Sequence, residues 1–230
     1  MANRLVKPCT VIVGHYGSGK TNFAVNLALS LKRDRPDLPV RIADLDTVNP
    51  YFRTADAAEM LRSRGVIPLL PDFANSNVDI PIIPAALGSA IRDEGFTVVD
   101  VGGDDGAVAL GMFRAELRAV GAAVFFVVNR FRPLISTPEG ARDCMEEIEE
   151  ASGLKCTALV NNSNLGAETT EEDILSSVSY ARECAALCSL PLFAHCWMPA
   201  QVPRLPEAFA EAGLGDEPLF PMEQATRRLF

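Results

Sequence analysis

The sequence predicts an α/β fold, a doubly wound and mainly parallel sheet with helices on both faces. Two observations support this: short apolar, β-branched runs recur along the 230 residues, and segments of helical periodicity separate them. Several runs are continuously apolar, as expected for strands buried on both faces of a parallel sheet. The runs expected to be strands are 9–13, 40–43, 66–70, 97–101, 123–128, 156–160 and 192–196.

Helices are predicted where apolar residues recur every three or four positions. After Lys20 such residues share one face through Leu31, and the same spacing recurs over 171–188. A third helix is expected where Met145 and Ile148 point inward and the neighbouring glutamates face solvent. These segments supply the helical layers of the fold.

The first predicted strand runs into a phosphate-loop pattern. Residues 14–21 (GHYGSGKT) satisfy G-x-x-x-x-G-K-[ST] and lead directly into the first helix. Glycines allow a tight turn with N–H groups pointing inward, and the helix N-terminus adds positive potential. Lys20 is expected to reach the β and γ phosphates and Thr21 to bind Mg²⁺. The remaining candidate nucleotide-binding residues here are Gly14, His15, Tyr16, Gly17, Ser18, Gly19 and Asn22.

Carboxylates follow two other predicted strands. Asp100 ends an apolar run and precedes Gly103 by three residues, which fits a residue that holds Mg²⁺ through water. Asp44 and Asp46 end the second strand, at the edge where doubly wound sheets bind ligands. We assign catalysis to Lys20, Asp46 and Asp100, and metal binding to Thr21, Asp46 and Asp100. Asp44 is the alternative to Asp46 for orienting the attacking water.

The phosphate loop, the D-x-D at 44–46 and the V-V-D-x-G-G at 98–103 together resemble the MinD/ParA and nitrogenase-iron-protein branch of the SIMIBI class of P-loop NTPases. The T-P-E at 137–139 and the V-N at 160–161 agree with the pattern, and bacterial ATP-binding proteins of that class have similar DxDxVNPYFR and VNNxNLG stretches. The resemblance implies Mg-ATP binding, an ATPase of low basal rate, a homodimer closing over nucleotide and a protein client. It also implies that Asn161, with Asn162 beside it, contacts the base.

One position departs from the MinD/ParA pattern. That pattern places a signature lysine before two glycines, and the corresponding places here are His15, Tyr16 and Gly17. His15 could partly replace the lysine or simply line the loop. Activation across a dimer through this position is therefore in question.

Two other functions remain open. A ligase or kinase similar to dethiobiotin synthetase would phosphorylate a small acid, with Asn22 and residues 75–77 available to bind a polar metabolite. The loop is also similar to that of metal-insertion GTPases, which read guanine with N-K-x-D. The chain has N-N-S-N at 161–164, without that lysine and aspartate, so ATP is favoured over GTP.

Three arginines and three cysteines have both a functional and a structural interpretation. Arg53, Arg130 and Arg132 are candidate arginine fingers, although surface ion pairs explain each of them more simply. The cysteines could form a metal site, but two of them lie on the apolar stripe of a predicted helix, which favours burial. They are Cys184, Cys188 and Cys196.

Composition limits the partners and the location. A formal net charge of −9 disfavours nonspecific binding to nucleic acid or anionic membranes. No secretory signal and no run of roughly 18 apolar residues is evident, so we expect a cytoplasmic protein with reduced cysteines. We expect residues 1–199 to form a P-loop nucleotide-binding domain, and residues 200–230 to pack on it as a C-terminal extension with one short helix at 207–212.

Overall fold

A computed structural model describes residues 5–45, 54–69, 86–102 and 104–225. Within these residues the chain forms one eight-stranded sheet of order β3-β2-β4-β1-β5-β6-β7-β8, and every pairing in it is parallel. The strands are β1 (Cys9–Val13), β2 (Val40–Asp44), β3 (Val66–Leu69), β4 (Phe96–Asp100), β5 (Ala123–Val128), β6 (Ala158–Asn161), β7 (Leu192–Trp197) and β8 (Leu219–Pro221).

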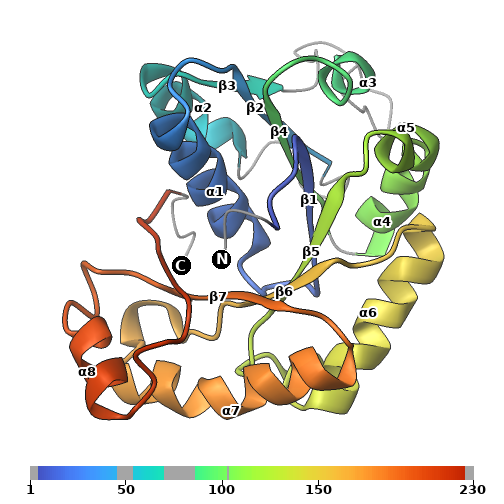
Figure 1. The fold of residues 1–230 in the computed structure, drawn as a ribbon. Helices are drawn as coiled ribbons and strands as arrows, with labels where there is room; N and C mark the ends of the chain where they lie inside the picture. The colour runs from blue at the N-terminus through green and yellow to red at the C-terminus, as the bar shows by residue number, and fades with distance from the viewer. Residues whose placement is uncertain (1–4, 46–53, 70–85, 103, 226–230) are drawn as a thin grey trace.

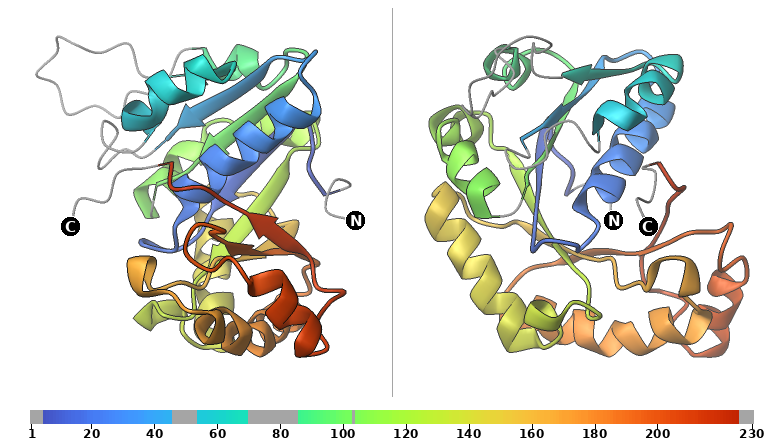
Figure 2. Two further views of the ribbon diagram at one scale, coloured as in Figure 1. Left: turned by 90° about the vertical axis from the view of Figure 1, so that its left-hand side faces the viewer. Right: turned by 180° about the vertical axis from the view of Figure 1, so that it is seen from behind.

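Helices cover both faces of this sheet, which confirms the predicted α/β doubly wound class. Helices α1 and α2 lie on one face, and α4, α5 and α6 lie on the other (Figures 1 and 2). The helices are α1 (Lys20–Asp34), α2 (Thr54–Ser63), α3 (Leu87–Ala90), α4 (Asp104–Gly111), α5 (Arg114–Ala119), α6 (Pro138–Ser152), α7 (Glu171–Leu187) and α8 (Leu205–Glu211), with short 3₁₀ turns at Pro133–Ile135 and Gly166–Glu168.

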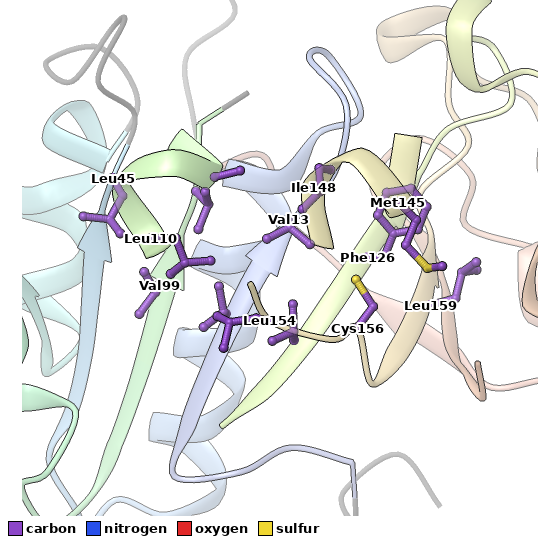
Figure 3. Close-up of a cluster of buried hydrophobic side chains, with 14 of the residues drawn as sticks. Val13, Leu45, Val99, Leu110, Phe126, Met145, Ile148, Leu154, Cys156 and Leu159 are labelled. Carbon is purple, nitrogen blue, oxygen red and sulfur yellow. The ribbon is translucent and has the colours of Figure 1, made fainter. Parts of the chain in front are cut away.

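The pleat of the central strand divides the core into two layers. Val11 and Val13 of β1 face the cluster formed with α4 and α6, whereas Ile12 faces the cluster formed with α1. Figure 3 shows part of the first cluster, in which Val13 lies among side chains that include Met145 and Ile148 of α6. Both layers are needed because a parallel sheet exposes two apolar faces.

The starts of α6 and α7 follow from local capping chemistry. The side chain of Thr137 accepts a hydrogen bond from the Gly140 N–H at 3.2 Å, and Pro138 occupies the first turn of α6, where its missing N–H is not needed. Helix α7 begins with a capping box between Thr170 and Asp173. The T-P-E segment therefore starts a helix.

The C-terminal residues add an unpredicted strand to the sheet. Strand β8 pairs with β7, with Trp197 opposite Pro221, and α8 begins at Leu205, two residues before the predicted start. Pro218 and Pro221 indicate turns in the sequence, yet proline is tolerated at a sheet edge, where fewer ladder hydrogen bonds are required. Strand β8 thus extends the same sheet that carries the phosphate loop.

Candidate functional site

The phosphate loop joins the end of β1 to the start of α1 at the carboxyl edge of the sheet. Gly17 and Gly19 have φ values of 78° and 85°, in the left-handed region that favours glycine. The loop closes through a hydrogen bond from the Ser18 N–H to the His15 carbonyl at 3.1 Å, and Lys20 Nζ donates to the same carbonyl at 3.1 Å. Lys20 therefore folds back over the loop, where a bound phosphate would meet it.

Asn162 holds the loop from the end of β6. Its Nδ2 donates to the Ser18 carbonyl at 2.8 Å and lies so close to Gly19 that a Cβ there would clash with it. Asn162 is among the predicted nucleotide-binding residues, and in the structure its side chain supports the backbone of the loop. Glycine is required at position 19 both by this contact and by the backbone conformation. Direct contact between Asn162 and a nucleotide stays a prediction.

Arg132 supports the loop from the segment that follows β5. Its Nε donates to the Gly17 carbonyl at 2.8 Å, and the side chain is exposed. The carboxyl ends of β5 and β6 thus supply side chains that fix consecutive loop carbonyls. Arg130 is directed elsewhere, because its guanidinium donates to the Ser176 carbonyl in α7. A role for either residue as an arginine finger stays a prediction.

Two predicted carboxylates lie side by side at the same edge of the sheet. Asp44 on β2 and Asp100 on β4 are register partners, and each is 2% exposed. Thr21 is buried at the start of α1. Carboxylate and hydroxyl oxygens are the ligands that Mg²⁺ prefers, so this donor set fits the ion. Asp46, the preferred candidate for positioning water, lies outside the described residues, as do Arg53 and residues 75–77.

The buried hydroxyl of Ser18 indicates whether the loop offers a polar group to a ligand. Ser18 is fully buried, and its Oγ has no hydrogen-bond partner in the part of the chain that the structure describes. A buried hydroxyl without a partner is costly, and a ligand oxygen would satisfy it. The arrangement therefore suits an anion with several acceptor oxygens.

Asn161 belongs to a buried network between β6 and β7. Its Nδ2 lies 2.9 Å from Ser177 Oγ and 2.8 Å from His195 Nδ1, and its Oδ1 accepts from the Ser163 hydroxyl at 2.7 Å. The amide is thus directed into the protein. Contact between Asn161 and a nucleotide base stays a prediction and would require some of these bonds to be exchanged.

His195 continues this network towards the surface. Its Nε2 lies 3.0 Å from Glu217 Oε2, and Glu217 also accepts from Arg182 Nε at 2.7 Å. Because Asn161 Nδ2 donates to Nδ1, the proton of the neutral imidazole lies on Nε2. Burial lowers the pKa of His195, and the Glu217 hydrogen bond only partly opposes this effect. His195 is not among the predicted residues, because a lone histidine in an apolar strand was its only signal in the sequence.

Asn129 is also absent from the predicted residues, although an asparagine directly after an apolar strand is visible in the sequence. Its Oδ1 accepts from the N–H groups of Phe131 and Asn164, at 3.0 and 3.3 Å, and its Nδ2 donates to the Asn164 carbonyl at 3.1 Å. These bonds tie the segment after β5 to the segment after β6. They position Arg132 and Asn162, the two residues that support the loop.

The cysteines are buried or partly buried and free. Burial raises the pKa of the Cys184 thiol to about 12 and also raises that of Cys196, so both are inert thiols near neutral pH. Across the described ranges no three histidine, cysteine, aspartate or glutamate side chains are grouped to hold a metal ion. None of the described helices has the length and apolar character needed to cross a bilayer.

Comparisons with known proteins find solved structures of similar fold. No family model matches the sequence, and no curated protein matches it. Among solved structures, chloroplast FtsY from Physcomitrella patens is similar with a TM-score of 0.52 and 17% identity, over 81% of this chain and 57% of that one. FtsY from Mycoplasma mycoides gives a TM-score of 0.51 and 16% identity, over 81% of this chain and 59% of that one.

The chain spans less than two thirds of the length of these FtsY structures. At such identities the likeness concerns the fold alone. It does not select the MinD/ParA branch or the base that is bound. Sheet order, loop geometry and structural likeness together show that the chain has a P-loop NTPase α/β fold.

Proposed function

We propose that this protein binds Mg-ATP and acts as a slow ATPase, a nucleotide-dependent switch for a protein client. The phosphate loop carries the proposal, because its two left-handed glycines, the folded-back Lys20 and the buried Ser18 hydroxyl form a site for a polyphosphate. Lys20 would bind the β and γ phosphates, and the loop N–H groups would hold their oxygens.

Mg²⁺ would be held by Thr21 and, through water, by Asp100, with Asp46 or Asp44 orienting the attacking water. The burial of Asp44 and Asp100 as register partners supports this assignment, since adjacent buried carboxylates are stabilised by a cation. When bound, the ion would neutralise the charge that develops on the phosphates during transfer. ATP is proposed over GTP because 161–164 lack the lysine and aspartate that read guanine.

The proposed switch role rests on exposed apolar side chains around the loop. Tyr16 is 63% exposed within the loop itself, and Leu134, which follows the loop-binding Arg132 by two residues, is 69% exposed. Exposed apolar side chains beside a nucleotide site suit a protein surface that assembles in one nucleotide state. The net charge of −9 favours a protein client over nucleic acid. A homodimer that closes over nucleotide is part of this proposal.

Lys20→Ala tests nucleotide binding. We expect ATP affinity to fall at least 100-fold in calorimetric titration with Mg²⁺, because the cation over the phosphates is lost. Lys155→Ala is the matched control, since the Lys155 side chain is 86% exposed and pairs only with Glu149 among the described residues. Equal ATP affinity in wild type and Lys20→Ala would refute the assignment. Stronger binding of GTP than of ATP would refute the choice of base.

Asp100→Asn tests the contribution of Mg²⁺ separately from the binding of the nucleotide itself. We expect ATP affinity measured in EDTA to change little and the gain on adding Mg²⁺ to shrink about tenfold or more, because the carboxylate charge that supports the ion is removed. Native mass spectrometry with and without Mg-ATP would show on the same samples whether nucleotide drives dimerisation. An unchanged gain from Mg²⁺ in Asp100→Asn would argue against the metal assignment.

A further inference from the structure

The buried imidazole of His195 belongs to a chain of hydrogen bonds that runs from the protein surface to the segment after β6. Strands β6 and β7 are paired, and α7 and α8 lie beside them in the lower part of Figure 1. We propose that His195 is a positioning residue for the phosphate loop, and that the proton on its imidazole controls the affinity of the loop for nucleotide. The proposal rests on the proposed function, because it needs nucleotide binding at the loop.

The Asn161 amide has a single orientation that satisfies its partners in β7 and α7. The Ser177 hydroxyl donates to the Ile174 carbonyl at 2.7 Å, so its oxygen is left to accept from Asn161 Nδ2 at 2.9 Å. The same Nδ2 lies 2.8 Å from His195 Nδ1, which must therefore be the second acceptor. Asn161, Ser177 and His195 are each at most 1% exposed, so a lost bond is not replaced from bulk water.

The oxygen of the same amide fixes the segment after β6. Asn161 Oδ1 accepts from the Ser163 N–H at 3.2 Å and from the Ser163 hydroxyl at 2.7 Å. Ser163 Oγ in turn accepts from the Arg130 N–H at 3.0 Å, in the segment after β5. These two segments carry Asn162 and Arg132, whose side chains donate to carbonyls of the phosphate loop. The orientation of the Asn161 amide therefore helps to set the position of both loop supports.

A second proton on His195 would reverse this arrangement. Nε2 already carries a proton and faces Glu217 Oε2 at 3.0 Å, so the added proton goes to Nδ1 and turns an acceptor into a donor. Two donors would then face each other, and the Asn161 amide must rotate to present Oδ1 to the imidazolium. Rotation takes Oδ1 away from Ser163 and places Nδ2 against the Ser163 N–H. The support of the loop is weakened, and nucleotide affinity falls with it.

Charged groups from two neighbouring elements act on this proton. Burial disfavours the charged imidazole and lowers its pKa, whereas Glu217, just before β8, favours the charged form. Arg182 of α7 disfavours it and also donates to Glu217. From α8 the imidazole meets the uncharged ring of Phe209, with centroids 5.7 Å apart. His195 is therefore neutral near pH 7, the state that supports the loop, and it becomes charged only on acidification.

Proton binding and nucleotide binding must affect each other equally, since one coupling free energy links them. The wild-type protein, with ¹⁵N-labelled histidine, is titrated by NMR when free and when saturated with Mg-ATP. We expect ATP to lower the pKa of His195. Calorimetry should show ATP affinity at least fivefold weaker about one pH unit below that pKa than about one unit above it, with circular dichroism as the check on folding. A His195 pKa that ATP leaves unchanged would overturn the inference.

His195→Asn is the conservative variant, because its Oδ1 takes the place of Nδ1 as an acceptor but does not titrate. It should bind ATP within about threefold of wild type at pH 7.5 and show a flatter pH profile. His15, the other histidine of the chain, and the γ phosphate titrate in both proteins, so the difference between the profiles isolates His195. His195→Leu removes the acceptor and should weaken ATP at least tenfold at pH 7.5.

Glu217→Gln should move the pH profile while the loop stays untouched. Its amide oxygen still accepts from Nε2–H, but the charge that favours the imidazolium is lost, so the His195 pKa and the fall in ATP affinity should both move to lower pH. Glu207→Gln is the matched control, because Glu207 is an exposed glutamate of α8, and it should move neither.

Three outcomes decide between the proposals. Equal pH profiles in wild type and His195→Asn would overturn this inference and leave Mg-ATP binding in place. A His195 pKa that moves in Glu217→Gln without a matching move in ATP affinity would do the same. Wild-type protein that binds no ATP at pH 7.5 would overturn the proposed function and this inference with it.

Discussion

Gly19 combines two constraints that usually occur apart. Its φ of 85° disfavours any side chain, and its α-carbon lies against the amide of Asn162, which is hydrogen-bonded to the Ser18 carbonyl. The first constraint concerns only the backbone, whereas the second concerns the position of the loop. Gly213 allows the two constraints to be measured separately. It has a φ of 72°, so it has the backbone constraint, but a Cβ added there would meet no atom within 4 Å.

Substituting both glycines by alanine should separate the two effects. Gly213→Ala is expected to lower the free energy of unfolding by about 1 kcal/mol, the strain of a left-handed alanine. Gly19→Ala should cost at least ~1 kcal/mol more, because Asn162 must move, and should also weaken ATP at least tenfold. Urea unfolding and calorimetry give the two readouts. Equal losses of stability in Gly19→Ala and Gly213→Ala would mean that the Asn162 side chain moves aside at no cost in free energy.

The contact between Asn162 and the loop also shows which side-chain roles the sequence could predict and which it could not. The phosphate-loop pattern identified Lys20 and Thr21 because their spacing is local. The family resemblance assigns Asn161 and Asn162 to nucleotide binding, but the sequence does not say which of the two side chains faces the loop, since neighbouring side chains at a strand end point in opposite directions. The structure directs Asn161 to His195 and Asn162 to Ser18.

At the scale of elements, helix α7 depends on its first turn. Thr170 Oγ1 accepts from the Asp173 N–H at 3.3 Å, and Asp173 Oδ2 accepts from the Thr170 N–H at 2.8 Å. Thr170→Ala should lower the free energy of unfolding by about 1 kcal/mol, because the hydroxyl that accepts from the Asp173 N–H is lost. Thr170→Ser keeps the hydroxyl and should stay within about 0.5 kcal/mol of wild type in urea unfolding. A loss as large for serine as for alanine would exclude capping as the cause.

The network from β6 through β7 to α7 should make stability depend on pH. Burial lowers the pKa of His195 in the folded state below its unfolded value of about 6.5, so the unfolded chain binds the proton more tightly. Its contribution to stability is therefore complete above about pH 6.5 and is lost as pH falls towards the lowered folded pKa. Urea unfolding between about pH 7.5 and 5 should show falling stability in wild type and a flatter profile in His195→Gln. An equally steep profile in the variant would rule out His195 as the source.

Strands were predicted best where both faces are buried. Strands β1 and β5 have the predicted bounds, because every residue in them is apolar or buried and turn residues flank them. Strand β8 was missed because it has only three residues and proline at its end. The two hydrogen bonds between the Asn26 side chain and the Glu223 backbone could not be predicted from the sequence either, since they join positions 197 residues apart. Contacts of that range depend on the assembled sheet rather than on local pattern.

At the scale of the molecule, we propose that residues 200–225 unfold together with the rest of the domain. Phe220 of β8 packs against Phe23 of α1 and Phe193 of β7, with ring centroids 5.4 and 5.9 Å away. Phe220→Ala should lower the free energy of unfolding by about 2 kcal/mol, less than for a fully buried phenylalanine because the ring is partly exposed. Leu134→Ala, at a side chain that is 69% exposed, is the control and should have little effect.

Cooperativity is measured with the single tryptophan. Trp197 lies at the junction of β7 and β8, so its fluorescence reports on the C-terminal edge, whereas far-ultraviolet circular dichroism reports on all helices. Coincident urea transitions by the two probes, in wild type and in Phe220→Ala, are expected for one cooperative unit. An earlier transition by fluorescence would mean that the C-terminal edge unfolds separately.

Strand β1 lies inside the sheet, although it precedes the other described strands in the chain. Its neighbours are β4, which begins at Phe96, and β5, which begins at Ala123. At a synthesis rate of about 5–20 residues per second, β1 is synthesised roughly 4–17 s before its first neighbour begins to be made. During translation this apolar strand and the glycine loop after it have no sheet to join. The nascent chain must therefore be kept from aggregating until both neighbouring strands have been synthesised.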